Sequence, residues 1–496
     1  MTAPEPAFRY RGIVEGFYGP PWSAGDRSWW VEALGRLGMN RYVVAPKEDP
    51  LHRARWPERY PADALEEAAA LVARGRAHGV EVGFGVSPGL SIRPSRSGDV
   101  AALLAKFRDF HACGVRFFVL ALDDVPSHLP DSGDRERFGS LAAAHVCLAH
   151  AVHETFPDAT LWFVPNDYTG VAATDYLEEV GETLAPAIEV AWTGRSTLAP
   201  GIAASEARTR AAVLRRRPLL WDNVPVADGP MRRMLHLGRY LGRDPALPGH
   251  VSGILLNPMS LPRSSWLTVA CAAAYLEAPS RYDPDRAWHD AAAELGRGAP
   301  DAFRCFASAH RFSPQDPDPG DTDLARALAR LSDSLERGGD VHADAVALRS
   351  LSARRRALAE DLAALEDRDL AREIAPWVAG HHEESRRIDA AAQVLCTVFD
   401  PGVPAFDRCA AYSVFEGSLT LHPPAATVSY GPRRVFHPQL VSHRDTDAGF
   451  GADPALYTGC NLADRAVSLA TQACLPRLGG VAVSGAAAPP QRDEQG

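Results

Sequence analysis

The chain has 496 residues and a net charge of −10, with 46% hydrophobic and 23% charged residues. This length exceeds an ordinary single domain, and the composition is typical of a soluble globular protein rather than of a disordered or membrane chain. The sequence has no long basic run, which argues against nucleic acid as a partner because phosphate binding needs clustered Lys and Arg.

The first residues of the sequence do not predict a targeting signal. The first ten residues lack the basic start and the apolar stretch of a secretory signal, and no apolar run reaches the roughly eighteen residues of a membrane-spanning helix. The eight cysteines lack the C-x-x-C spacing of a zinc or redox site, so we expect mostly buried thiols. We expect a cytoplasmic protein without membrane contact, and disulfide pairing of the C-terminal cysteines only if the protein is exported.

Residues 9 to 277 alternate short β-branched and aromatic runs with amphipathic stretches, a pattern typical of βα units and a parallel sheet. Helices are predicted, for example, over 64–79, 99–114 and 138–156. Eight strands are predicted, at 11–17, 41–47, 80–86, 115–122, 160–166, 188–194, 218–224 and 252–258. Eight βα units suit a closed (β/α)8 TIM barrel over 8–280, whereas an open doubly wound sheet normally has about five to seven strands.

The strand signal stops after the barrel. A Pro- and Asp-rich loop, 313–323, precedes a run of helical patterns, and the whole segment 281–395 is predicted to be a small helical domain. Leucines share one helix face at Leu324, Leu328, Leu331 and Leu335, and again at Leu348, Leu351, Leu358, Leu362 and Leu365. No fold is predicted for 396–476, and 477–496 is expected to be a disordered tail.

The active site of a (β/α)8 barrel lies at the carboxyl ends of its strands. Candidate residues at this edge are Gly16, Lys47, Asp123, Asp124, Tyr168, Trp192, Trp221, Asn223, Asp228 and Asn257. A lysine directly after an apolar strand is costly to bury without a partner, which favours a functional Lys47. Trp192 and Trp221 are equally well explained as core residues, and Gly16 as a turn residue.

Two carboxylates, Asp123 and Asp124, follow the apolar run VRFFVLAL. Neighbouring strand side chains point to opposite faces, so the second carboxylate must turn into the site through the following loop. Like charges at short range raise one pKa and leave the other group ionised. This asymmetry suits a general acid beside an anionic helper; by itself, a DD pair is more often a helix cap or a solvated loop.

Seven ordered strings resemble glycoside hydrolase family 84, the family of the protein O-GlcNAcases and their bacterial β-N-acetylglucosaminidase relatives. They are RGIVEGFYGPPWS (11–23), YVVAPKEDPLHR (42–53), FFVLALDDV (117–125), VPNDYTG (164–170), VAWTGR (190–195), LLWDNVPVADG (219–229) and GILLNP (253–258). The sequence departs from the pattern at Asn166 and Asp167, where Thr-Glu is expected, and PVADG lacks an aromatic residue. These departures leave the leaving-group preference open.

The resemblance implies a retaining reaction in which the substrate's own 2-acetamido oxygen attacks the anomeric carbon. It implies that Asp123 orients the acetamido N–H and stabilises an oxazoline-like intermediate, while Asp124 is the general acid and then the base. Lys47, Asp228, Asn257 and the Gly16 backbone would bind the sugar hydroxyls. Tyr168 and Asn223 would position the acetamido group, with Trp192 and Trp221 as apolar walls.

The implied partner is a glycoside or glycoprotein that carries N-acetylglucosamine; the oligomeric state stays open. No cofactor or metal is implied, because the run from His381 to Glu384 does not have the H-E-x-x-H spacing. Two alternatives remain: a hexosaminidase acting on hyaluronan or peptidoglycan fragments, and a non-catalytic N-acetylhexosamine-binding protein on the same barrel.

Overall fold

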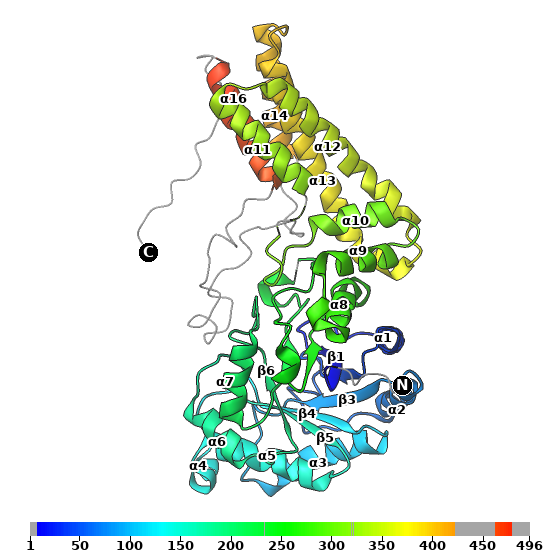
Figure 1. Ribbon diagram of the computed structural model, residues 1–496, viewed down its shortest axis with the longest axis vertical. Helices are drawn as coiled ribbons and strands as arrows, with labels where there is room; N and C mark the ends of the chain where they lie inside the picture. Colours follow the sequence, from blue (N-terminus) through cyan, green and yellow to red (C-terminus); the bar gives the residue numbers. More distant parts are fainter. Residues whose placement is uncertain (1–6, 233, 319, 321, 422–461, 479–496) are drawn as a thin grey trace. The chain divides into compact units, whose positions relative to one another are not determined.

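The computed structural model describes residues 7–232, 234–318, 320, 322–421 and 462–478 (Figure 1). Contacts divide these residues into two compact units. The first unit contains the described residues between 7 and 320 together with 360–377. The second contains 322–359, 378–421 and 462–478.

Eight parallel strands close a barrel in the first unit, in chain order and with β1 beside β8. They are β1 (Tyr10–Glu15), β2 (Arg41–Val44), β3 (Glu81–Val86), β4 (Phe117–Ala121), β5 (Thr160–Val164), β6 (Glu189–Trp192), β7 (Leu219–Asp222) and β8 (Gly253–Leu256). Every predicted strand is present, so the predicted barrel is confirmed.

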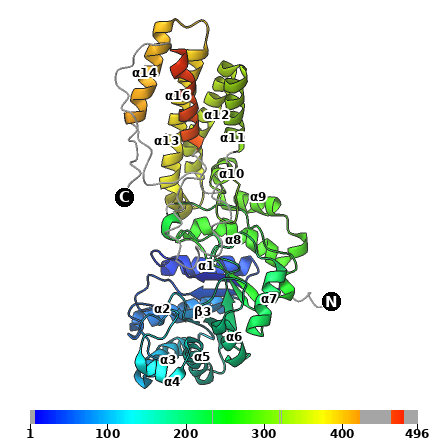
Figure 2. The ribbon, with the colours of Figure 1, turned by 90° about the vertical axis from the view of Figure 1, so that its left-hand side faces the viewer.

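Helices surround this barrel in both views (Figure 1, Figure 2). They are α1 (Ala24–Arg36), α2 (Ala62–Ala77), α3 (Ser97–Ala112), α4 (Ser132–Phe138), α5 (Leu141–Thr155), α6 (Asp175–Thr183), α7 (Ala204–Leu214) and α8 (Pro262–Glu277). The predicted helix 138–156 begins later than expected: Gly139 ends α4 with a φ of 73°, and the Ser140 hydroxyl accepts the Ala143 N–H at the start of α5.

The prediction of eight complete βα units is wrong at the seventh. Among its described residues, the connection from β7 to β8 contains only the short 3-10 turns Gly229–Met231 and Leu247–Gly249. Proline and glycine interrupt any helical run here, at Pro225, Gly229, Pro230, Gly238, Gly242, Pro245 and Pro248. The segment in the place of a seventh helix is therefore irregular.

Alternate side chains of the strands fill the barrel interior. One buried cluster contains Val14, Val43, Val119 and Leu255 with the rings of Trp162 and Trp221, whose centroids lie 5.4 Å apart. The intervening residues face the helices, as Phe118 does, whose ring lies 4.9 Å from that of Phe107 on α3. Because both faces of the sheet are covered, the strands have continuous apolar sequences.

The chain continues beyond the barrel in helices. The first unit also contains α9 (Pro284–Leu295) and α10 (Pro300–Ala309); the helices that follow are α11 (Thr322–Arg337), α12 (Val341–Asp361), α13 (Arg368–Phe399), α14 (Ala405–Leu421) and α16 (Leu462–Arg477). The core of the second unit contains Leu324, Leu328, Leu331 and Leu348. Leu335 and Leu351 of the predicted faces pack against this core and are partly buried, and α16 adds Ala466, Ala470 and Cys474. Leu358, Leu362 and Leu365 are also buried, and the last two belong to the first unit.

The segment without a predicted fold contains α14 and α16. Most of the predicted disordered tail, 479–496, lies outside the described residues. Among the described helices, none combines the length and hydropathy that a membrane span requires.

Candidate active site

The lumen-facing pattern of the strands continues into the residues that follow them. In four strands, a polar side chain lies two residues beyond a residue of the buried lumen cluster: Lys47 after Ala45, Asp123 after Ala121, Asn223 after Trp221 and Asn257 after Leu255. Since side chains two residues apart in a strand share a face, the four polar groups converge at the carboxyl mouth of the barrel.

Lys47 and Asp123 form a buried ion pair. The Lys47 ammonium donates to Asp123 Oδ2 at 2.8 Å, and both side chains are no more than 10% exposed. Burial raises the pKa of Asp123, but the Lys47 charge, the Lys47 hydrogen bond and the Arg53 charge together outweigh burial and hold the pKa below its usual value. The other oxygen, Oδ1, is buried and accepts no hydrogen bond from the described residues. Asp123 therefore offers an ionised acceptor.

Asp124 turns into the site as the sequence predicts. Its φ of 54° lies in the left-handed region, which breaks the strand alternation and lets a second carboxylate face the same mouth. The Tyr168 hydroxyl donates to Asp124 Oδ1 at 3.1 Å. Partial burial, and then the negative charge of Asp123, raise the pKa of Asp124 above its usual value. The two neighbouring carboxylates are thus shifted in opposite directions.

A second hydrogen-bonded group lies across the mouth. Asn223 Oδ1 accepts from the Trp221 indole at 3.0 Å and from the Asn257 amide at 2.9 Å. Asn257 Oδ1 in turn accepts the Gly16 N–H at 3.2 Å. A Cβ at Gly16 would lie 2.2 Å from the Trp221 ring, so close packing requires glycine at this position.

Asp228 lies six residues beyond β7 and closes one side of the mouth. Its Oδ1 accepts the Tyr18 N–H at 3.0 Å. Burial raises the pKa of Asp228 to about 7, with the Tyr18 N–H and the Lys47 charge opposing the shift. This carboxyl can therefore exchange a proton near neutral pH.

Trp192 differs from the other nine candidates because its side chain projects away from the barrel lumen. Its neighbour Ala191 belongs to the lumen cluster, so the indole projects to the opposite face, where it is fully buried. The indole N–H donates to the Gly170 carbonyl at 2.8 Å, and the Thr193 N–H donates to the Tyr168 carbonyl at 3.0 Å. Trp192 supports the loop that bears Tyr168 and does not line the mouth.

Two other strand-end carboxylates point away from the barrel lumen. Glu15 is fully buried and binds Arg27 of α1 through both oxygens. Asp222 is almost fully buried and pairs with Arg243, and it accepts the Tyr240 hydroxyl at 2.7 Å. Strand alternation thus separates these structural carboxylates from the pair at the mouth.

Asn166 has a role that the sequence does not reveal. Its side-chain oxygen accepts the Val125 N–H at 3.3 Å, and its own backbone N–H binds the Tyr176 hydroxyl. It therefore stabilises the backbone directly after Asp124. The sequence marks Asn166 only as a departure from the family pattern.

The described residues contain no group of three or more His, Cys, Asp or Glu side chains arranged to hold a metal ion. The chemistry available at the mouth is that of two neighbouring carboxylates with opposite pKa shifts, the carboxyl group of Asp228, a lysine, a tyrosine and amide groups. This set is suited to proton transfer and to the binding of hydroxyl and amide groups.

Comparisons with known proteins match this description. The sequence model of a family described as beta-N-acetylglucosaminidase matches residues 11–308. Protein O-GlcNAcase from Rattus norvegicus and from Mus musculus are each 34% identical over 254 residues, which cover 50% of this chain. The matched part spans only 28% of the length of these curated relatives.

Solved structures resemble the chain over a larger share. A mutant of the Thermobaculum terrenum O-GlcNAc hydrolase has a TM-score of 0.81 and 27% identity, and the match covers 94% of this chain and 95% of that one. A solved structure of CpGH84B has a TM-score of 0.75 and 25% identity, and the match covers 86% of this chain and 75% of that one.

Proposed function

Because the chain belongs to the β-N-acetylglucosaminidase family, we propose that it is a retaining enzyme that releases terminal β-linked N-acetylglucosamine from a glycoside or glycoprotein. The names of the O-GlcNAcase relatives support this substrate class. One observation carries the proposal: Asp123 is held ionised with one oxygen unpaired among the described residues, directly beside Asp124 with a raised pKa.

In the proposed reaction the substrate supplies the nucleophile. Its 2-acetamido oxygen attacks the anomeric carbon, the glycosidic C–O bond breaks, and Asp124 gives its proton to the leaving oxygen. Asp123 Oδ1 accepts the acetamido N–H and stabilises the positive charge of the resulting oxazolinium ring. Water then attacks the anomeric carbon, Asp124 takes its proton, and the ring opens to give N-acetylglucosamine with retained configuration.

The other candidates would bind the sugar at the same mouth. Lys47, Asp228, Asn257 and the Gly16 backbone would bind the hydroxyl groups. Tyr168 and Asn223 would position the acetamido group against Trp221. We assign Trp192 a supporting role instead of the predicted wall, since it has no exposed surface. A cytoplasmic location remains a prediction from the sequence.

Turnover of three aryl glycosides tests this function. The β-N-acetylglucosaminide should be hydrolysed, and the β-glucoside should not, because it lacks the internal nucleophile. The β-N-acetylgalactosaminide tests recognition of the 4-hydroxyl. Hydrolysis of the glucoside at a comparable rate would contradict the mechanism. Binding of N-acetylglucosamine without turnover of any glycoside would favour the non-catalytic alternative, and preference for hyaluronan or peptidoglycan fragments over a glycopeptide would change the substrate class.

A further inference from the structure

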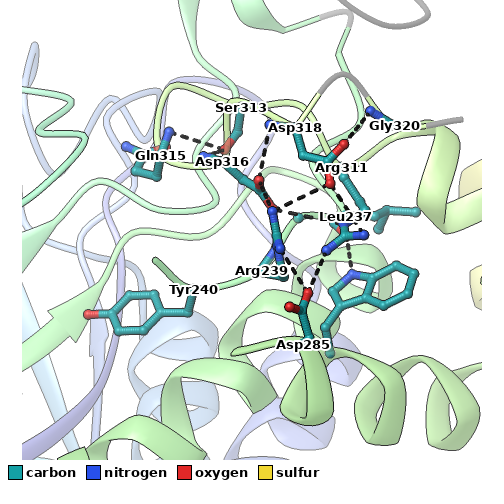
Figure 3. A network of polar contacts seen from close by, with 12 residues as sticks. Leu237, Arg239, Tyr240, Asp285, Arg311, Ser313, Gln315, Asp316, Asp318 and Gly320 are labelled. Carbon is teal, nitrogen blue, oxygen red and sulfur yellow. Dashed lines mark hydrogen bonds and ion pairs between the residues drawn. The ribbon is translucent and has the colours of Figure 1, made fainter. Parts of the chain in front are cut away.

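The irregular connection from β7 to β8 is braced by a polar network outside the mouth (Figure 3). Its centre is Asp316, whose side chain is fully buried. Arg239 binds both Asp316 oxygens, through Nε at 3.0 Å and through Nη2 at 2.9 Å, and the Arg239 backbone N–H adds a third hydrogen bond at 3.0 Å. This is the two-pronged geometry that best compensates a buried carboxylate.

Neighbouring residues fix this ion pair in place. Asp285 accepts from Arg239 at 2.8 Å and from Arg311 at 3.2 Å, so it joins the two arginines. The Arg311 guanidinium lies 4.7 Å from the centre of the Trp288 ring. The Ser313 hydroxyl accepts the Asp316 N–H at 3.0 Å and so shapes the 313–318 segment. The segment is thus held on two sides, from the β7–β8 connection and from α9.

The clamped segment reaches the predicted active site through one side chain. The Gln315 side chain is 3% exposed, and its amide donates to the backbone carbonyl of Asn223 at 3.0 Å. That carbonyl lies just after β7, and buried backbone carbonyls need a partner. Farther along the same loop, the His236 ring nitrogen Nδ1 contacts the carbonyls of Pro225 and Val226 at 3.1 and 3.0 Å.

Two acceptors at one ring nitrogen require that this nitrogen carries a proton, so His236 donates to the loop. Burial lowers the pKa of His236 to about 4, which keeps the ring neutral. The loop from Asn223 to Asp228 therefore has its carbonyls held by Gln315 and His236. Both side chains belong to segments that pack on each other, since the Leu237 N–H donates to the His310 carbonyl at 2.9 Å.

We propose that Gln315 is a positioning residue for the reaction: through the Asn223 carbonyl it sets the place of the Asn223 amide and of the loop leading to Asp228. The inference deepens the proposed function and rests on it. It extends the functional unit beyond residues 11–308, the stretch that matches the family, to the segment clamped by Arg239 and Arg311. Gln315 itself touches no substrate.

A carboxyl in place of the amide gives the sharpest test. In Gln315→Glu the protonated carboxyl still donates to the Asn223 carbonyl, whereas the ionised form repels it. The Gln315 hydrogen bonds go to the Ser313 hydroxyl and the Asn223 carbonyl and involve no cation, and burial raises a carboxyl pKa, so this change takes place within the accessible pH range. Relative to the unmodified protein, kcat of Gln315→Glu on the aryl β-N-acetylglucosaminide should be nearly unchanged at low pH and fall about tenfold as the pH rises.

Two further variants complete the design. Gln315→Leu removes the donor at every pH, so its kcat should be about tenfold lower across the whole profile. Gln393→Glu makes the same exchange at an exposed position on α13 and should leave the profile unchanged. If the role of Gln315 is purely structural, both Gln315 variants should lose stability, and the ratio of their kcat to that of the unmodified protein should not depend on pH.

Hydrogen exchange of the 223–229 peptide gives a readout that needs no turnover. Faster exchange in Gln315→Leu, at an unchanged melting temperature, supports the positioning role even if the unmodified protein hydrolyses none of the glycosides. In that case the proposed function fails, but the inference that Gln315 positions the loop from Asn223 to Asp228 is retained. Unchanged exchange of this peptide in Gln315→Leu, or equal kcat ratios for Gln315→Glu at all pH values, would overturn the inference.

Discussion

At the scale of single residues, the site depends on opposite pKa shifts of two adjacent carboxylates, Asp123 and Asp124. Lys47 keeps Asp123 ionised, while burial and the charge of Asp123 keep Asp124 protonated to higher pH. The backbone makes this possible, because the left-handed φ of Asp124 lets both groups face one mouth. One side chain is then an acceptor and its neighbour a proton donor within the same short segment.

The assignment of the acid predicts a dependence on the leaving group. Asp124→Asn should lower kcat/KM by about 10²- to 10⁴-fold for an alkyl glycoside, which needs protonation of its leaving oxygen. A nitrophenyl glycoside needs little protonation, so its kcat/KM should fall much less. Asp290→Asn, at a side chain 75% exposed on α9, is the matched control. Equal losses on both substrates would contradict the acid role.

Lys47 should control the acid limb of the pH profile. Its positive charge lowers the pKa of Asp123, so Lys47→Met should raise that pKa and move the acid limb of kcat/KM upward by about one pH unit or more. Lys47→Arg retains the charge and should shift the limb less. If the acid limb of both variants lies at the same pH as in the unmodified protein, Asp123 does not need to be ionised.

Asp228 should lower the free energy of unfolding of the free protein, although it contributes to sugar binding. Its pKa is raised from 3.8 in the unfolded chain to about 7 in the folded protein, so the folded state retains a proton that the unfolded state has lost. The resulting destabilisation is absent below about pH 4, grows as the pH rises, and is complete above about pH 7. Asp228→Asn should therefore stabilise the free protein at pH 8 more than at pH 5.

Urea denaturation of the two proteins at both pH values measures this difference, and binding of N-acetylglucosamine should weaken in the same variant. A gain in stability that is equal at pH 5 and pH 8 would show that Asp228 does not titrate in this way.

At the scale of the elements, strand alternation sorts the carboxylates by role. Asp222, one residue before the candidate Asn223, faces outward and pairs with Arg243 in the β7–β8 connection. Removal of Arg243 leaves an uncompensated buried carboxylate. Arg243→Met should cost about 3–5 kcal/mol in the free energy of unfolding, measured by denaturant titration. The double variant Asp222→Asn with Arg243→Met should recover part of the loss; if it recovers nothing, the two side chains do not act as a pair.

Most of the barrel is predictable at this scale, because each strand is a short apolar run with polar residues at its end. It is harder to predict which face of the sheet each side chain points to. In VAWTG, a register shift of one residue exchanges Ala191 and Trp192 between the lumen and the helices, and both residues are compatible with either environment. The described residues between β7 and β8 form no α-helix, because this segment is rich in proline and glycine.

At the scale of the whole chain, the family's sequence model matches residues 11–308, whereas the supports of the site extend farther. Gln315 lies in a Pro- and Asp-rich stretch that the sequence marks only as a separator. Its contact with Asn223 joins residues 92 positions apart, and neither composition nor period indicates such a pair. The predicted leucine faces locate α11 and α12, although Leu362 and Leu365 belong to the first unit, and α14 and α16 follow no comparable pattern in the sequence.

The central claim is that the substrate supplies the nucleophile, that Asp123 orients and stabilises it, and that Asp124 transfers the proton. Aryl β-glycosides whose acetamido methyl carries zero, one, two or three fluorines test this most directly, because each fluorine weakens the amide oxygen as a nucleophile without changing the leaving group. We predict that kcat falls at every step of the series, and by more than about tenfold over the whole of it. A rate that stays constant along the series would contradict the mechanism.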